Sequence, residues 1–334
     1  MTCFLEKKEF AENLLVSLRE AKSICLTTHV HPDGDGLCAC LALKRILHSM
    51  GYQADFVVDD LNLDRYDYLQ VFDHVTVDNE QMNYDLVIVI DLHDYQRLGS
   101  RLHLVKSASK VIVLDHHEIQ NDMMDCAFAW VDSKAVCTGW MLQEIFQNLI
   151  QALPAEDKSY VGMCLYTTLL NDTNNFTNAN TDKNAYEMAA QICTYGVRTF
   201  LVHRLFMALR TPAEMILIGH VLSTIESFDG ERILFMHSTL QMLQELGLTP
   251  ESTSNLSRLV QNLKGVETTV YFREEEEGSY RLSLRSKTIN VNAIAVKYDG
   301  GGHLQASGCY IKGSLQKVKD IIKAEILSAQ KLVN

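Results

Sequence analysis

The chain has 334 residues, of which 47% are hydrophobic and 22% charged, so it is long enough for two globular domains with a core each. Its formal net charge of −12, without a lysine- or arginine-rich block, argues against binding a long nucleic acid, because such binding needs many basic contacts to phosphates. No run approaches the ~18 apolar residues of a membrane span, which argues against a membrane protein.

The cysteines and the N-terminus indicate the cellular compartment. The 9 cysteines are an odd number and form no C-x-x-C pair, as expected in a reducing cytoplasm. The first residues carry charged side chains from Glu6 to Glu9 and lack the apolar core of a signal peptide. We therefore expect a cytoplasmic protein.

The first half of the chain alternates strand and helix signals. A helix is predicted over 37–50, and runs rich in Val, Ile and Leu predict strands at 23–28, 55–58, 86–90 and 111–114. Runs that are apolar on both faces are typical of parallel strands buried between helices. The alternation predicts an α/β fold with a doubly wound, mainly parallel sheet, in which ligands bind beyond the carboxyl ends of the strands.

The second half is first helical and then mixed. Helices are predicted at 139–149, 159–170, 184–195, 199–209 and 213–225. A last helix over 315–332 follows shorter strands at 233–236, 267–272, 280–285 and 307–311. These patterns predict a first domain over 1–197, a helical connector over 198–228 and a smaller α/β domain over 229–334.

Acidic and histidine residues follow the predicted strands and indicate a binuclear metal centre. His29, Asp33 and Asp35 lie in HVHPDGD, residues 29–35, although aspartates there can also simply cap the following helix. Asp91 follows the strand 86–90, where a turn residue is the alternative. Carboxylates and imidazoles gathered at strand ends suit two divalent cations.

The triplet Asp115, His116 and His117 directly follows the strand 111–114. Two histidines after a buried strand rarely serve packing, so we expect one to bind metal and the other to reach a phosphate. Asp115 can accept the free ring N–H and fix the tautomer. Asp172 ends an apolar helix and is another candidate ligand, with a helix-ending turn as the alternative.

A glycine run near the end of the chain, GGGH at 300–303, indicates a phosphate contact. Consecutive glycines let backbone N–H groups approach an anion closely. His303 directly after them favours this interpretation over a flexible hairpin. Arg285 is a candidate for a second contact, because the guanidinium fork matches phosphate oxygens.

Taken in order, these clusters resemble the motifs of the DHH phosphoesterase superfamily. The later segments resemble the associated DHHA1 domain: RLSLRSK at 281–287, VNAIA at 291–295 and GGGHLQASG at 300–308. The resemblance covers nearly the whole chain and extends to the stand-alone nanoRNase and pAp-phosphatase group. It implies that 1–197 is a DHH catalytic, metal-binding domain and that 229–334 is a DHHA1 substrate-binding domain.

The resemblance also implies a set of site residues and two Mn²⁺ ions, with Mg²⁺ or Co²⁺ as substitutes. One ion would be held by His29, Asp33 and Asp91, and the other by Asp35, Asp91, His116 and Asp172. The implied catalytic residues are His117, Asp115 and Asp91. The implied substrate contacts are Arg285, Ser286, Gly301, Gly302 and His303.

We expect a hydrolase that cleaves short oligoribonucleotides (nanoRNA) and 3′-phosphoadenosine 5′-phosphate (pAp) to mononucleotides and AMP. A phosphodiesterase of cyclic di-AMP or pApA is the main alternative. An exopolyphosphatase or a non-catalytic nucleotide-binding protein is a weaker one. The expected partners are short oligonucleotides or nucleotide phosphates and, through the helical connector, a second copy of the chain in a homodimer.

Overall fold

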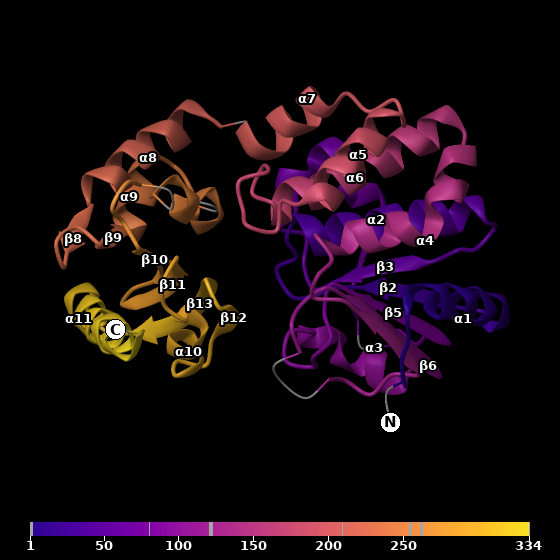
Figure 1. Cartoon of the computed structure of the whole chain (residues 1–334), viewed down its shortest axis with the longest axis horizontal. Helices are drawn as coiled ribbons and strands as arrows, with labels where there is room; N and C mark the ends of the chain where they lie inside the picture. Colours follow the sequence, from indigo (N-terminus) through magenta and orange to yellow (C-terminus); the bar gives the residue numbers. More distant parts are fainter. Residues whose placement is uncertain are drawn as a thin grey trace. The chain divides into compact units, whose positions relative to one another are not determined.

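The computed structural model describes residues 3–79, 81–119, 123–208, 210–253, 256–260 and 263–333. The chain divides into two compact units, Met1–Leu209 and Arg210–Asn334 (Figure 1). Within the described ranges no single helix is both long and apolar enough to cross a membrane. Only the bent pair Thr199–Met207 and Pro212–Ser223, taken together, reaches that length and hydropathy.

The first unit is built on a parallel sheet of seven strands. In chain order they are β1 (Cys3–Phe4), β2 (Ile24–Thr27), β3 (Asp55–Val58), β4 (Val75–Val77), β5 (Leu86–Ile90), β6 (Lys110–Asp115) and β7 (Phe128–Val131). Their order across the sheet is β1-β7-β6-β5-β2-β3-β4, and every neighbouring pair is parallel. The predicted fold class is confirmed.

The strand order places a switch point between β2 and β5. From β2 the chain adds β3 and β4 on one side, whereas from β5 it adds β6 and β7 on the other. In doubly wound sheets the crevice for a ligand opens at the carboxyl ends of the strands on either side of such a point. The loops after β2 and β5 are the two that carry His29 and Asp91.

Helices cover both faces of this sheet, because alternate strand residues point to opposite sides. Ile88 packs in one core with α1, α2, α4, α5 and α6, while Val87 and Val89 pack in a second core with α3 (Figure 1). The helices are α1 (Lys7–Glu20), α2 (Gly34–Ser49), α3 (Leu102–Ser107), α4 (Thr138–Ala152), α5 (Ala155–Asp172), α6 (Lys183–Cys193) and α7 (Thr199–His203).

The second unit is a mixed sheet of six strands in the order β12-β13-β11-β10-β9-β8. Only β9 and β10 pair in parallel. The strands are β8 (Glu226–Phe228), β9 (Ile233–Ser238), β10 (Thr268–Glu276), β11 (Ser279–Ser286), β12 (Gly301–His303) and β13 (Ala306–Lys312). The glycine run at 300–303 thus contains a short edge strand.

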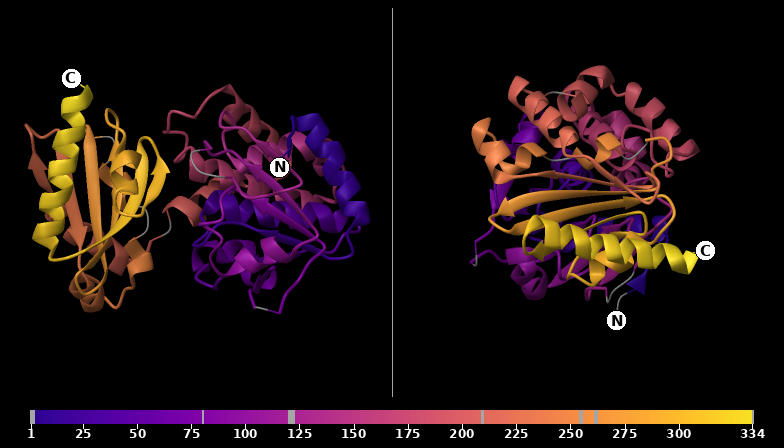
Figure 2. Two further views of the ribbon diagram at one scale, coloured as in Figure 1. Left: turned by 90° about the horizontal axis from the view of Figure 1, so that it is seen from below. Right: turned by 90° about the vertical axis from the view of Figure 1, so that its left-hand side faces the viewer.

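Four helices cover the two faces of this second sheet. They are α8 (Pro212–Ser223), α9 (Leu240–Glu245), α10 (Val291–Val296) and α11 (Leu315–Val333). One core contains α10 and α11, with α11 lying along the sheet in Figure 2, and the other contains α8 and α9.

The predicted connector over 198–228 spans the boundary between the units. Its first helix is shorter than expected, since α7 ends at His203 and continues as a π-helical turn, Arg204–Ala208. Its second helix, α8, belongs to the second unit, where Leu217 and Val221 pack against Leu234 and Met236 of β9. A connector separate from both domains remains a prediction.

Candidate metal centre

The loop between β2 and α2 presents the first three predicted ligands. Asp33 caps α2, because its Oδ1 accepts hydrogen bonds from the backbone N–H groups of Asp35 (2.9 Å) and Gly36 (3.3 Å). The same Oδ1 lies 3.8 Å from Nε2 of the buried His29. The capping alternative and the ligand interpretation are therefore compatible.

Gly36 makes close packing of this loop possible. A Cβ at this position would lie 2.2 Å from Oγ1 of Thr28 and 3.1 Å from Oδ2 of Asp91. Any larger residue would push these two groups apart. The glycine therefore fixes how closely α2 approaches the end of β5.

Asp91 lies at the centre of the arrangement. It follows β5 in a left-handed backbone conformation (φ 62°), which is uncommon for a residue other than glycine and concentrates at functional sites. Its Oδ2 is 3.6 Å from Nε2 of His29, and its Oδ1 is 3.5 Å from Nε2 of His116 and 3.4 Å from Nδ1 of His117. One carboxylate thus faces histidines on both sides.

The carboxylate of Asp115 is fully occupied with hydrogen bonds. Its Oδ1 accepts from the backbone N–H of His116 (2.7 Å) and His117 (3.1 Å) and lies 2.8 Å from Nδ1 of His117, while Oδ2 pairs with Nδ1 of His93. Burial opposes ionisation, but His117 and His93 hold the pKa of Asp115 well below its usual range. Asp115 therefore orients His117 and fixes its tautomer.

Asp172, at the end of α5, completes the cluster. Its Oδ2 is 3.0 Å from Nε2 of His116, and that nitrogen is also 3.5 Å from Oδ2 of Asp35. Although it lies this close to His116, Oδ2 of Asp172 is buried and accepts no hydrogen bond of regular geometry from the described residues. An anionic oxygen buried in this way carries a large desolvation cost, which a cation would offset.

The structure brings all six predicted ligands together in three groups. The donor atoms of each group lie within 4.8 Å of one another: His29, Asp33 and Asp91; Asp35, His116 and Asp172; and Asp91, His116 and His117. Ligands about 2.1 Å from a shared cation are roughly 3–4 Å apart, so these spacings fit such ions. Asp91 and His116 each belong to two groups, and Asp91 is the predicted bridging ligand.

The charges of the cluster also fit cations. Burial, and then Asp172 and Asp91, raise the pKa of Asp35 well above its usual value, and burial raises that of Asp172. Burial opposes protonation of His116, but carboxylates, foremost Asp172, raise its pKa well above the usual value. The buried carboxylates therefore carry more negative charge than the surrounding protein compensates.

Three residues that hold these ligands were not predicted from the sequence. The backbone N–H groups of Thr138 and Gly139, at the start of α4, donate to Asp35 (2.6 and 3.1 Å), and the Thr138 hydroxyl donates to Asp91 (3.1 Å). The third is His93, which pairs with Asp115. The sequence signals were a third histidine near a strand-end aspartate and a Thr-Gly pair opening a helix.

Arg101 supports the loop that follows β2 and carries His29. Its guanidinium is buried and donates to the carbonyl of Thr28 (2.7 Å) and the hydroxyl of Thr27 (2.9 Å). Asp59 accepts from Nε (3.0 Å) and Nη2 (2.9 Å) of the same side chain. This network fixes the backbone just before His29.

The predicted substrate contacts lie in the second unit, along three neighbouring strands. Arg285 on β11 and His303 on β12 are both paired with Ala306 on β13, so their side chains lie at the same level and on the same face of the sheet. The hydroxyl of Ser286 is buried and accepts from the backbone N–H groups of Thr288 (3.2 Å) and Ile289 (3.1 Å).

Gly301 and Gly302 complete this set on β12. At Gly302 (φ 143°) a Cβ would lie 2.5 Å from the carbonyl oxygen of Ala306, so no other residue fits without a shift of the strand. The predicted substrate residues thus gather at one end of the β11–β13–β12 ladder.

This fold and this centre define a class of phosphoester hydrolase, and two family profiles match the chain accordingly. Residues 23–169 match "DHH family, N-terminal domain" and residues 235–328 match "DHHA1 domain". The chain belongs to the DHH/DHHA1 phosphoesterase family.

Curated relatives resemble the chain over most of its length. It is 29% identical to "Bifunctional oligoribonuclease and PAP phosphatase NrnA" of Thermus thermophilus, over 92% of this chain and 91% of that protein. It is 27% identical to the protein of the same name from Bacillus subtilis, over 86% and 89% of the two chains.

Solved structures share the fold. An exopolyphosphatase-related protein from Bacteroides fragilis superimposes with a TM-score of 0.86 at 19% identity, over 98% of both chains. RecJ from Thermus thermophilus, crystallised with Mn²⁺, gives a TM-score of 0.55 at 14% identity, over 97% of this chain and 55% of that one.

Proposed function

We propose that the protein is a manganese-dependent phosphoesterase that hydrolyses short oligoribonucleotides and pAp to mononucleotides and AMP. The observation that carries this proposal is the sharing of the buried Asp91 between two groups of metal-ligand side chains. The names of the curated relatives support the substrate class. The cytoplasm is the proposed location.

We assign one Mn²⁺ to His29, Asp33 and Asp91, and the other to Asp35, Asp91, His116 and Asp172. Mg²⁺ or Co²⁺ would be substitutes. When bound, such a pair of cations polarises a phosphate and lowers the pKa of water. Asp91 would hold both sides of the centre together, while Asp33 and Thr138 keep the surrounding carboxylates in place through the starts of α2 and α4.

His117 is the proposed proton-transfer residue. Its side chain keeps 24% of its surface exposed, whereas that of Asp115 is fully buried, so His117 is the accessible member of the pair. Asp115 holds Nδ1, and we assign to Nε2 the role of stabilising the phosphoryl oxygens or of protonating the leaving oxygen. Asp115 and His93 act by positioning this ring.

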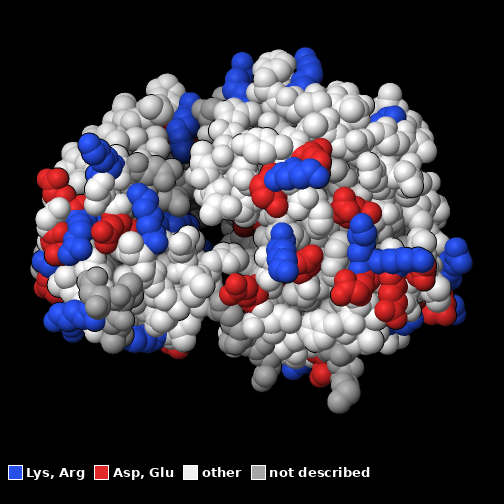
Figure 3. All heavy atoms as spheres, in the orientation of Figure 1, with Lys and Arg blue, Asp and Glu red and all other residues white. Residues whose placement is uncertain are grey.

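The second unit is proposed to bind the phosphates of the substrate. Arg285 and His303 share one face at the level of Ala306, and Gly301 and Gly302 add exposed backbone beside them. Ser286 would act through the turn that it holds with Thr288 and Ile289. Acidic and basic side chains are interspersed on the surface in Figure 3, an arrangement that suits short substrates better than a long polyanion.

A substrate panel tests the proposal. We expect Mn²⁺-dependent release of mononucleotides from RNA dimers to pentamers and of AMP from pAp, with no turnover in chelator. Faster cleavage of cyclic di-AMP or pApA would assign the protein to the signalling phosphodiesterases, and a preference for polyphosphate to the exopolyphosphatases. Binding of nucleotides without turnover at any metal concentration would leave a non-catalytic binding protein.

Proton release should accompany metal binding. Burial and Arg97 oppose protonation of His29, but Asp33 and Asp91 raise its pKa to about 9 in the protein without cations. The ring therefore carries a proton at neutral pH, which has to leave when a cation binds. Below pH 9 the affinity for Mn²⁺ should fall by about tenfold per pH unit for each proton displaced.

Calorimetric titration of the chelator-treated protein with Mn²⁺ between pH 6 and 8.5 measures this dependence. Buffers with different ionisation enthalpies give the number of protons released. An affinity that stays constant over this range would contradict the assignment of His29 as a ligand.

A homodimer is the proposed assembly. Helix α8 exposes the apolar side chains of Met215, Ile216 and Leu222, and Ile225 just beyond the helix is also exposed. Burying such side chains against a second copy would remove them from water. Light scattering after size exclusion should give twice the chain mass, and a monomer at micromolar concentration would refute this.

A further inference from the structure

A hollow in the first unit gathers basic side chains far from the metal centre. Its volume is about 240 Å³, below the roughly 300–1,000 Å³ of pockets for drug-sized ligands, so it fits a small molecule. None of the residues that line it is acidic. Its polar and aromatic lining consists of Lys44, Arg45, His48, Tyr52, Gln53, His74 and Tyr160.

The hollow lies at the opposite edge of the sheet from the metal centre. Ala54 and His74, which line it, directly precede β3 and β4 and so mark the amino ends of these strands. Lys44, Arg45 and His48 come from the last turns of α2, whose first turn carries Asp35. Ten residues of helix, about 15 Å, separate Asp35 from Arg45.

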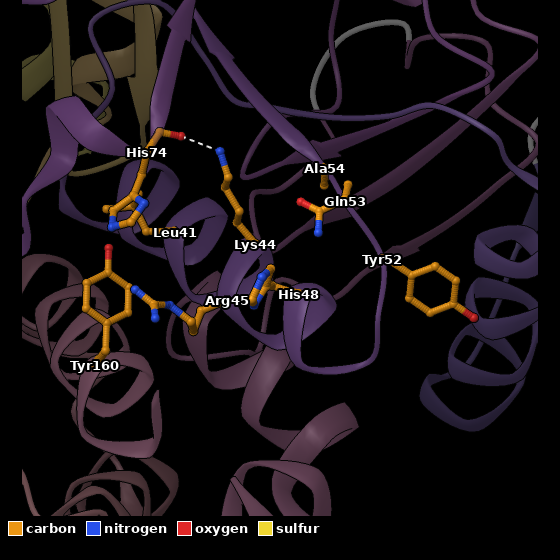
Figure 4. Close-up of a pocket in the computed structure, with 9 residues that line it drawn as sticks. All are labelled: Leu41, Lys44, Arg45, His48, Tyr52, Gln53, Ala54, His74 and Tyr160. Atoms are coloured by element: carbon orange, nitrogen blue, oxygen red, sulfur yellow. Dashed lines mark hydrogen bonds between the residues drawn. The ribbon is translucent and has the colours of Figure 1, made fainter. Parts of the chain in front are cut away.

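Several polar groups of the hollow have bonding capacity left over. Nζ of Lys44 donates to the carbonyl of His74 (2.7 Å), which uses one of its three protons. Nη1 of Arg45 donates to Asp157 (2.9 Å), and its guanidinium lies 4.5 Å from the ring centre of Tyr160 (Figure 4). Among the described residues, Nε2 of His74 is buried without a hydrogen-bond partner.

The basic side chains of the hollow have acidic neighbours, all of which lie outside its lining. Burial lowers the pKa of Lys44, and the nearby Asp55 opposes this shift. The pKa of His74 is also lowered, first by burial and then by the positive charges of Arg45 and Lys44. The carboxylates near these side chains are thus Asp55, Asp73 and Asp157, which all lie outside the lining.

A second hollow of the same unit shows the contrasting case. It has about 270 Å³ and also lies at the amino edge of the sheet, beside the start of β5. Here Lys110 is paired with Glu20 (3.0 Å), and Asp85 accepts from the backbone N–H groups of Lys22 and Ser23. Its charges are balanced within the lining, so it offers nothing comparable to an anion.

We propose that the hollow formed by Lys44, Arg45, His48 and His74 is a binding site for the phosphate group of a small phosphomonoester, separate from the metal centre. The guanidinium of Arg45 and the ammonium of Lys44 would contact the phosphate oxygens, and Tyr52 and Leu41 would contact the organic part. A mononucleotide as ligand rests on the proposed function, because it would be the product of that reaction.

Calorimetric titration of the full-length protein in chelator tests this site without the metal centre. We expect saturable binding of AMP, weaker binding of inorganic phosphate and no binding of adenosine. Lys44→Gln and Arg45→Gln should each weaken AMP binding by about tenfold or more, because each removes a charge-assisted hydrogen bond. Lys110→Gln, the matched change in the second hollow, should leave the affinity unchanged.

Thermal melts of each variant establish that it is folded, and the two variants of the basic hollow give independent readings. The proposal is overturned by absence of saturable AMP binding, by equal affinity in wild type and in both variants, or by equal binding of adenosine. Binding of phosphate without AMP also overturns it. Since the titration contains no metal, its result does not depend on whether the protein hydrolyses any substrate.

Discussion

Replacing Asp91 by alanine should abolish turnover, with a loss of at least about a thousandfold. Asp91 is shared by two of the three ligand groups, so its removal takes a ligand from both proposed cations and leaves the phosphate without its principal charge stabilisation. The measurement is the rate of pAp and RNA-dimer hydrolysis at saturating Mn²⁺.

Thermal stability separates a lost metal centre from a lost fold. Mn²⁺ at a hundredfold excess over its Kd should stabilise the wild-type protein by about 2.7 kcal/mol, or roughly 5–10 °C in Tm for a unit of this size. Asp91→Ala should lack this rise. Its metal-free Tm should equal or exceed that of the wild type, because the variant removes one of the carboxylates that raise the pKa of Asp35.

Asp60→Ala is the matched control. Asp60 also follows a parallel strand, β3, but it belongs to none of the ligand groups and accepts a hydrogen bond from the backbone of Asn62. Its substitution should leave both activity and the Mn²⁺-induced rise in place. Full activity of Asp91→Ala with Mn²⁺ would refute the proposed centre.

Replacing His117 by alanine should lower kcat by about 10²- to 10⁴-fold, the contribution typical of a positioned proton-transfer group. We expect the rise in Tm with Mn²⁺ to remain, because all six ligands assigned to the two cations are still present. The pH dependence of kcat should lose the limb that reports this imidazole.

Asp115→Asn should reproduce much of this loss. Asp115 fixes the Nδ1 tautomer of His117 and accepts hydrogen bonds at both oxygens, whereas an amide accepts at one oxygen only and sets an NH₂ donor against either His93 or the N–H groups of residues 116 and 117. His103→Ala, which removes a half-buried histidine paired with Asp78 outside the ligand groups, is the control. If His117→Ala also lost the metal-induced rise in Tm, His117 would be a ligand.

The sequence determined the local features of this protein. The runs 86–90 and 111–114 are apolar on both faces, which identifies buried parallel strands without knowledge of their neighbours. The carboxylates and histidines directly after these runs were therefore assigned to one edge of the sheet. These assignments depend on residues close together in the chain.

The tertiary structure decided which of these features meet. In the sheet β2 lies beside β5, with β3 and β4 on one side of this pair and β6 on the other. The periodicity of the apolar residues does not predict this strand order, because strand pairing depends on the packing of distant segments. That order brings His29 to Asp91. It also lets the start of α4, more than a hundred residues after Asp35, donate to that carboxylate.

The supporting contacts depended on the fold in the same way. His93, Arg101 and Thr138 hold the ligands through hydrogen bonds between segments far apart in sequence, and only His93 lies near a predicted cluster. The basic hollow likewise joins the end of α2 to His74 and to Tyr160 on α5. A sequence fixes which side chains are available, whereas long-range packing fixes the distances between them.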